Sequence, residues 1–150
     1  MKKKIAIIVL SIVILSVAFM FIKNNMTPRN LGVKDGKLYE MPNSPNAVSS
    51  QTDDEEKKVE PLSFRGDFEE SKAKIVEIIS TYKGTEIIKN EKNYIHVVFK
   101  TDGMGFKDDV EFYFDETTER IHFRSASRVG YSDMGLNRKR YEEIKSEYEK

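Results

Sequence analysis

An uncharged apolar run near the N-terminus constrains this chain more than any other feature. Residues 5–22, IAIIVLSIVILSVAFMFI, contain no charged side chain and follow three consecutive lysines at positions 2–4. At a rise of about 1.5 Å per residue, a helix of this length is about 27 Å long, close to the thickness of the hydrocarbon core of a bilayer. The rest of a 150-residue chain could not surround such a helix with apolar contacts on every side. The run therefore predicts a transmembrane helix.

The same run could instead be a cleaved signal peptide, whose apolar region is usually about 7–15 residues long and ends at small residues. Ser16 and Ala18 would serve as the cleavage site, but residues 19–22, Phe-Met-Phe-Ile, would then follow the cut. Because the run is long and the new N-terminus would be strongly apolar, we favour an uncleaved anchor. The absence of cysteine excludes a lipoprotein anchor.

The charges that flank the run predict its orientation. Three lysines precede it, whereas Lys23 and Arg29 follow it more sparsely, so the positive-inside rule predicts a cytoplasmic N-terminus. The prediction is a single-pass protein of the cell membrane with an extracytoplasmic C-terminal domain, and the lipid bilayer is its first partner, through residues 5–22. The predicted parts are a cytoplasmic N-terminus (1–4), a transmembrane signal-anchor (5–22), a stalk (23–37) and an exported α+β domain (38–150).

Composition restricts what the exported part can do. The chain has 25 Lys and Arg against 25 Asp and Glu, so its net charge is zero, and residues 23–150 alone carry −3 because the three leading lysines are set apart. A dedicated nucleic-acid binder is normally strongly basic, so no nucleic-acid partner is expected. With no cysteine, and with His96 and His122 as its only histidines, the sequence predicts neither a metal site nor a cofactor.

Two segments of the exported part have the pattern of helices. Asp67 and Glu70 have the spacing of a capping box, and Gly84 is a stop signal for the helix that follows them. The apolar face of this first helix consists of Phe68, Ile75, Val76, Ile79 and Tyr82. A closing helix follows Gly135, with Tyr141, Ile144 and Tyr148 on one face.

Strand patterns lie between the two predicted helices. Apolar runs and alternation predict four strands, at residues 87–88, 94–99, 110–114 and 121–123. Residues 115–120, DETTER, predict a hairpin turn, while residues 38–51 have the composition of a loop. The predicted fold is α+β, an antiparallel sheet of about four strands with two packed helices.

The register about the DETTER turn predicts a polar patch on one face of the sheet. If the hairpin is symmetric, Glu111 lies opposite Arg124, and Asp109 lies within reach of Arg128. Read as a solvated face, the patch would hold cross-strand ion pairs worth about 0.2–1 kcal/mol each, and this interpretation competes with that of a binding surface. Strand alternation gathers six side chains there, away from the phenylalanine core: Asp109, Glu111, Tyr113, His122, Arg124 and Arg128.

The stretch RSASRVGYSDMGLNRKR (124–140) ends in three cations. Residues 138–140 would occupy the first turn of the closing helix, capped by Asn137, where positive charges oppose the helix dipole. Such a conflict is typical of functional or strained sites, and arginines at a helix N-terminus can hold a phosphate or carboxylate. The alternative is that these cations pair with Asp133 or with the glutamates at 142 and 143.

Known catalytic templates are absent from the sequence. It contains no Gly-x-Ser-x-Gly, P-loop, dinucleotide fingerprint or His-Glu-x-x-His, so no catalytic residue is predicted. A hydrolase-like envelope enzyme is the alternative, and it would use Ser49 or Ser50 with Asp108 or Asp109 and a histidine. Adjacent carboxylates on a strand point to opposite faces, so the two aspartates would not act together.

Three motifs in one order, SPNAVSSQ (44–51), GFKDDVEFYFD (105–115) and RSASRVGYSDMGLNRKR (124–140), together resemble the domain of unknown function 1499 family. The resemblance covers residues 30–150. The family's first motif usually reads Cys-Pro-x-Ser-Pro-Asn-Cys, and here Met41 and Ala47 stand at both cysteine positions. Their joint absence implies that the cysteines, where present, act as a pair, in a disulfide or a shared ligand site. The resemblance implies a membrane- or envelope-associated domain and transfers no catalytic residue.

These observations favour a non-catalytic, membrane-anchored binding module whose arginines engage an anionic ligand. A lipid headgroup, a cell-wall polymer or an acidic protein surface would each supply the anion. The hydrolase is one alternative, and purely architectural motifs that satisfy buried backbone are another. The residues predicted to bind the ligand are Ser49, Ser50, Asp109, Arg124, Ser127, Arg128, Asp133, Asn137, Arg138 and Arg140.

Overall fold

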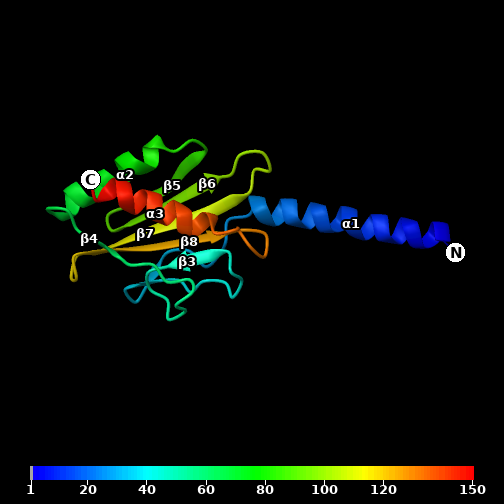
Figure 1. Ribbon diagram of the computed structural model, residues 1–150, viewed down its shortest axis with the longest axis horizontal. Helices are drawn as coiled ribbons and strands as arrows, with labels where there is room; N and C mark the ends of the chain where they lie inside the picture. Colours follow the sequence, from blue (N-terminus) through cyan, green and yellow to red (C-terminus); the bar gives the residue numbers. More distant parts are fainter. Residues whose placement is uncertain (1) are drawn as a thin grey trace.

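A long exposed helix and a helix-covered sheet make up the structure, a computed structural model that describes residues 2–150 (Figure 1). The three helices of these residues are α1 (Lys2–Asn25), α2 (Phe68–Thr81) and α3 (Leu136–Tyr148). The strands are β1 (Val33–Lys34), β2 (Lys37–Leu38), β3 (Ala47–Ser49), β4 (Leu62–Ser63), β5 (Thr85–Glu91), β6 (Tyr94–Lys100), β7 (Lys107–Asp115) and β8 (Arg120–Ser127).

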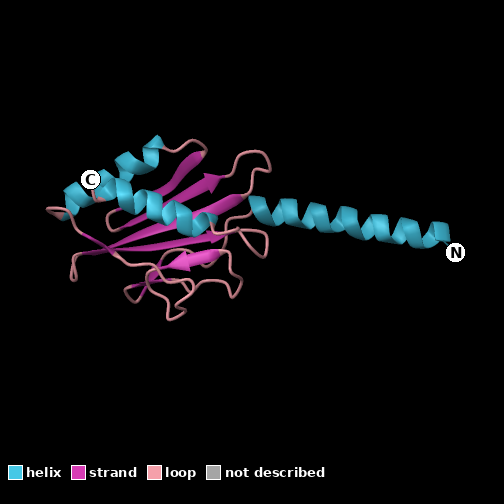
Figure 2. Cartoon of the chain, viewed as in Figure 1, coloured by secondary structure: helices cyan, strands magenta, loops and turns pink. Residues whose placement is uncertain are grey.

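Helix α1 contains the whole apolar run and projects from one end of the domain (Figure 2). Among residues 2–150 it is the one helix long and apolar enough to cross a membrane. Its last turn contacts the domain, because the side chain of Asn24 donates to the carbonyl of Gly105 and accepts from the backbone N–H of Lys107, both at 2.9 Å. The end of α1 is therefore held against the sheet.

The main sheet is antiparallel and larger than predicted. Its order is β3-β8-β7-β6-β5, and β4 also pairs with β8, so it has six strands instead of about four. The added β3 lies inside residues 38–51, where the prediction of a loop was wrong. Only three residues long and preceded by a proline-rich stretch, β3 is defined by its pairing with β8 and has no periodicity of its own. The α+β class is confirmed.

Helices α2 and α3 cover one face of the sheet and enclose the core (Figure 1). Asp67 caps α2 as predicted, and its Oδ1 accepts from the backbone N–H of Glu70 at 2.9 Å. Alternation along the strands directs one set of apolar side chains toward the helices. The buried side chains that meet there include Ile75, Ile79, Ile95, Phe112, Phe114, Phe123, Tyr141 and Ile144.

Much of the opposite face is also buried, contrary to its interpretation as a solvated surface: of the six side chains predicted there, only Tyr113 and His122 are partly exposed. The hairpin register is as predicted, with Glu111 opposite Arg124, yet these side chains are 0 % and 2 % exposed. The chain between α1 and β3 contacts this face: the backbone N–H of Gly32 donates to Glu111, and Arg124 donates to the carbonyl of Glu40. Part of the segment expected to be a stalk, residues 23–37, thus makes hydrogen bonds to the sheet.

Candidate functional site

Six ionisable side chains form what we call the charged cluster, on the face of the sheet away from α2 and α3. Glu111 lies at its centre: its Oε1 accepts from the hydroxyl of Tyr94 and from the N–H of Gly32, both at 2.7 Å, and its Oε2 accepts from Arg124 at 2.5 Å. All three donors are groups of this protein, so both carboxylate oxygens of Glu111 have hydrogen-bond partners within it. The cluster consists of Tyr94, His96, Asp109, Glu111, Arg124 and Arg128.

Asp109 occupies the end of the charged cluster nearest α1. Arg128 donates two hydrogen bonds to its carboxylate, from Nε to Oδ2 at 2.8 Å and from Nη2 to Oδ1 at 2.7 Å. His96 contacts the same Oδ1 through Nε2 at 2.8 Å. Arg128 also donates to the carbonyl of Asn24 at 3.3 Å, so the ion pair links the sheet directly to the end of α1.

The surroundings of two of these groups change their acidity. Burial alone would raise the pKa of Asp109, but the hydrogen bonds from Arg128 and His96 and the positive charge of Arg128 outweigh burial and hold this pKa below its usual value. Burial and the neighbouring Glu111 carboxylate raise the pKa of the Tyr94 hydroxyl. Asp109 is thus kept as an acceptor and Tyr94 as a donor.

A cavity of about 160 Å³, here called the junction pocket, lies between the charged cluster and the end of α1. Lys23 in the last turn of α1 is part of its wall, and Asp109 and two arginines form its sheet side. The Nε–H of Arg124 is buried with no hydrogen-bond partner among residues 2–150. The pocket is lined by Lys23, Pro28, Asn30, Leu31, Pro42, Asp109, Arg124, Ala126, Ser127 and Arg128.

A second polar group, the α3 cluster, lies on the helix side of the sheet. Arg140 donates to Asp108 at 2.7 Å and to Asn137 at 2.8 Å, while its guanidinium lies 4.6 Å from the centre of the Phe99 ring. Asn137 donates to the carbonyl of Asn46 at 3.0 Å. Together with the contacts to Ser125 and Ser127 of β8, these bonds link the start of α3 to β7, to β8 and to the residue before β3. The cluster consists of Asn46, Asp108, Ser125, Ser127, Asp133, Asn137 and Arg140.

The start of α3 differs from its prediction in one detail. Asn137 is not the cap, because the helix begins at Leu136 after Gly135, and Asn137 lies buried within the first turn. Asp133 supplies the acceptor instead: its carboxylate receives the N–H groups of Gly135 at 3.0 Å and Asn137 at 2.8 Å. A carboxylate at the N-terminus offsets the unfavourable effect of the nearby cations on the helix dipole.

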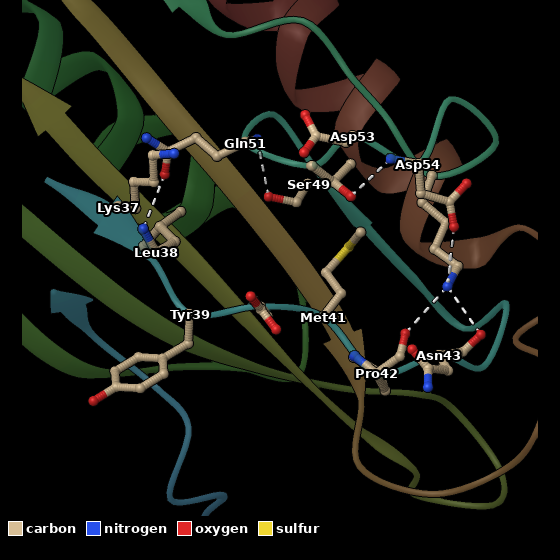
Figure 3. Close-up of a pocket in the computed structure, with 13 residues that line it drawn as sticks. Lys37, Leu38, Tyr39, Met41, Pro42, Asn43, Ser49, Gln51, Asp53 and Asp54 are labelled. Atoms are coloured by element: carbon tan, nitrogen blue, oxygen red, sulfur yellow. Dashed lines mark hydrogen bonds and ion pairs between the residues drawn. The ribbon is translucent and has the colours of Figure 1, made fainter. Parts of the chain in front are cut away.

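A larger cavity of about 350 Å³, the loop pocket, opens beside β3 (Figure 3). Met41, at the first cysteine position of the resembled motif, points into it between Ser49 and Asp54 (Figure 3). One wall is closed by Lys57, which donates to the carbonyls of Pro42 and Asn43. A thioether stands where the motif has a thiol, so in this chain the pocket provides hydrogen bonds and charges without thiol chemistry.

The hydrolase alternative needs a serine, a histidine and an aspartate in contact. Ser50 and His122 do meet, with Oγ 3.3 Å from Nδ1, and burial lowers the pKa of His122 against an opposing effect of Asp115. Asp109 is opposite Ala126, four residues along β8 from His122, or about 13 Å at 3.3 Å per residue. Asp108 lies on the other face, paired with Arg140. His96 contacts Asp109, but the hydrogen bonds of Ser49 and Ser50 among residues 2–150 do not include His96. Each histidine therefore meets only one of the other two groups, and the predicted trio is not assembled.

The ten predicted ligand residues separate into several places. Asp109, Arg124, Ser127 and Arg128 meet at the junction pocket. Arg140, Asn137 and Asp133 belong to the α3 cluster with Ser127. Ser49 lines the loop pocket and Ser50 contacts His122, while Arg138 donates to the carbonyls of Glu56 and Lys58 at 2.8 and 3.0 Å. The four arginines do not form one patch.

Sequence reasoning missed residues that complete the charged cluster and the junction pocket. Alternation along β6 puts Tyr94 and His96 on one face, and the β6–β7 register brings them beside Glu111 and Asp109. The sequence signal for Asn24 is weaker: it is an amide two residues after the end of the apolar run. Among residues 2–150, no group of three or more His, Cys, Asp or Glu side chains is placed to hold a metal ion.

Replacing Glu111 by glutamine should destabilise the domain strongly. The substitution removes the negative charge while Arg124 stays buried, and breaking a buried pair in this way costs about 3–5 kcal/mol. Chemical unfolding of the full chain in a non-ionic detergent measures the loss. The matched control is Glu116→Gln, which breaks an exposed pair with Lys92 at 2.8 Å and should cost about 0–1 kcal/mol. Equal losses for the two variants would contradict the central role of Glu111.

The lowered pKa of Asp109 predicts a specific acid sensitivity. Its stabilising contribution is present above the unfolded value of 3.8 and is lost as the pH falls through the lower folded value. In Asp109→Asn, the free energy of unfolding should therefore decline less than in the parent chain between about pH 5 and about pH 2. The exposed Glu69→Gln is the control and should keep the parent slope; a parent-like slope in Asp109→Asn would refute the assignment.

The sequence of this chain was compared with known proteins and protein families. None of the curated proteins compared matches the chain. The family model described as Protein of unknown function (DUF1499) matches residues 37–147, from β2 into α3. The matched stretch includes the main sheet, α2, the charged cluster and the α3 cluster, and it agrees with the resemblance of the three motifs. The chain therefore belongs to the DUF1499 family of proteins of unknown function.

Proposed function

We propose that this chain is a single-pass membrane protein whose extracytoplasmic domain binds an anionic group in the junction pocket. The helix α1 supports the first part, since its apolar side chains are exposed along its length and the domain does not cover them. The observation that carries the second part is the position of Lys23, Arg124 and Arg128 around one cavity at the end of that helix.

The charges at the pocket are unequal. Lys23, Arg124 and Arg128 supply three positive charges, whereas Asp109 and Glu111 supply two negative charges, which leaves an excess of one positive charge. Arg124 and Arg128 are 2 % and 7 % exposed, so their charges are poorly screened by solvent. An anion entering the pocket would balance the excess.

The donors that remain favour an oxyanion. An arginine has five N–H donors, and Arg124 uses one N–H of each terminal nitrogen, for Glu111 and for the carbonyl of Glu40. Its Nε–H has no hydrogen-bond partner among residues 2–150. Guanidinium groups suit phosphate and carboxylate oxygens because of their planar, forked geometry. A lipid headgroup, a wall polymer and an acidic protein surface share this chemistry. Arg138 and Arg140 are left out of the site because neither of them lines the junction pocket.

Labelling of single cysteines tests the orientation of the chain. Since the protein has no cysteine, Lys139→Cys in the domain and Lys3→Cys before the apolar run each provide one thiol. In spheroplasts, a membrane-impermeant maleimide should label Lys139→Cys, and should label Lys3→Cys only after permeabilisation. The reverse pattern contradicts the orientation, and recovery of a shortened soluble chain contradicts the uncleaved anchor.

Binding of inorganic phosphate tests the pocket. Lys23 is exposed and its removal breaks no ion pair found among residues 2–150, so Lys23→Glu should fold normally while losing the charge balance that attracts an anion. In the full chain in non-ionic detergent, phosphate should raise the unfolding temperature by a few degrees over sodium chloride of equal ionic strength.

The control for this experiment is Lys139→Glu on α3, whose partner Glu143 is 3.8 Å away at the surface. Phosphate stabilises most proteins through exclusion from their surfaces, so the difference between the two variants is the measurement. Lys139→Glu should keep the full shift and Lys23→Glu should lose most of it. Equal shifts would overturn the proposed anion site.

A further inference from the structure

Four large apolar side chains of the domain are much more exposed than the others outside α1. Met26, Met104, Tyr131 and Met134 are 61 %, 72 %, 79 % and 98 % exposed. Outside α1, the remaining exposed large apolar side chains of residues 2–150 reach only 37–43 %. Single exposed apolar residues need no explanation, but a group of the most exposed ones at one place does.

These four side chains belong to three segments at one end of the sheet. Met26 follows α1, Met104 lies between β6 and β7, and the other two lie between β8 and α3. Figures 1 and 2 show both loops beside the base of α1, one yellow-green and one orange in Figure 1. The hydrogen bonds of Asn24 to Gly105, Lys107 and Arg128 join the three segments. We call Met26, Met104, Tyr131 and Met134 the rim.

Met134 lies in a turn whose backbone conformation is unfavourable for a residue with a side chain. Met134 has φ 54°, in the left-handed region that disfavours residues with a side chain, and it is almost fully exposed. Its N–H donates to the hydroxyl of Ser132 at 3.2 Å, which supports the turn. Asp35 and Glu119 share this backbone region, but Met134 is the apolar one of the three, and its exposed side chain gains no packing within the domain to compensate the strain.

The two ends of the sheet differ in charge. Lys23, Lys100 and Lys107 lie at this end of the sheet, where the carboxylate of Asp133 is already engaged by the start of α3 and Asp102 is exposed. The opposite hairpin ends contain Glu91, Asp115, Glu116 and Glu119. These hairpin ends also contain Lys92 and Arg120 and are net acidic, whereas the end of the sheet where α1 leaves the domain is net basic.

We propose that the rim inserts into the headgroup region of the leaflet that α1 enters, so that the domain lies on the bilayer. This inference rests on the proposed function, because it requires α1 to span the membrane. Methionine and tyrosine side chains beside lysines suit the boundary between headgroups and acyl chains, where an apolar body and a cationic neighbour are both accommodated. The rim and α1 would then contact the same leaflet, with Lys23 at the depth of the headgroups.

Spin labels on single cysteines test this arrangement in the full chain reconstituted into vesicles of phosphatidylcholine and phosphatidylglycerol. Asp102→Cys places the label beside Met104 without removing a rim residue. Val13→Cys places it in the middle of α1, and Glu119→Cys places it at the far end of the sheet. The depth of each label is measured from the ratio of two collision rates, one with oxygen, which dissolves in the membrane, and one with a nickel chelate, which stays in water.

The expected result is a deep label at Val13→Cys, a shallow membrane position at Asp102→Cys and an aqueous position at Glu119→Cys. An aqueous label at Asp102→Cys with a deep label at Val13→Cys would overturn the rim proposal and leave the anchor intact. An aqueous label at Val13→Cys would overturn the anchor and, with it, the rim.

Paired triple variants show whether the rim side chains cause the insertion. In the Asp102→Cys chain, serine at the three rim positions of the domain should move the label into water. Serine at three other exposed apolar positions should leave it in the membrane, and no difference between the two sets would contradict the proposal. The rim set is Met104→Ser, Tyr131→Ser and Met134→Ser, and the control set is Tyr39→Ser, Ile87→Ser and Ile88→Ser.

Discussion

Two buried ion pairs on the face of the sheet away from the helices determine how the rest of the molecule is arranged. Asp109 with Arg128 and Glu111 with Arg124 are almost completely removed from solvent. Burying charge is costly unless every oxygen and nitrogen finds a partner, and the sheet alone does not supply enough. The segment between α1 and β3 provides further partners through the N–H of Gly32 and the carbonyl of Glu40.

The same ion pairs orient α1. Arg128 contacts both Asp109 and the carbonyl of Asn24, and the Asn24 side chain bridges to the β6–β7 loop. These contacts hold the end of α1 at one end of the sheet. The junction pocket and the rim both depend on this contact, because each combines residues of α1 or its end with residues of the domain.

Strand β7 explains why the three family motifs occur together. Its adjacent aspartates face opposite sides: Asp108 pairs with Arg140 under α3, and Asp109 pairs with Arg128 below the covering segment. Asn46 from the first motif joins the α3 cluster through Asn137. The motifs are therefore partly architectural, and the anion site that we propose uses only the arginines that also line a cavity. Architecture and the proposed binding are combined in the same side chains.

Local patterns in the sequence determined the long apolar helix, the capped helix α2, the central strands and the β7–β8 register, because helix periodicity, strand alternation and a short hairpin turn are properties of neighbouring residues. They also placed Asp109, Glu111 and Arg124 on one face. Tertiary structure alone decided that this face is buried, that β3 is a strand, and that Arg138 and Arg140 are separated from Arg128. Those outcomes depend on contacts between residues as far apart as Asn24 and Arg128, and no local pattern records which distant segment covers a sheet face.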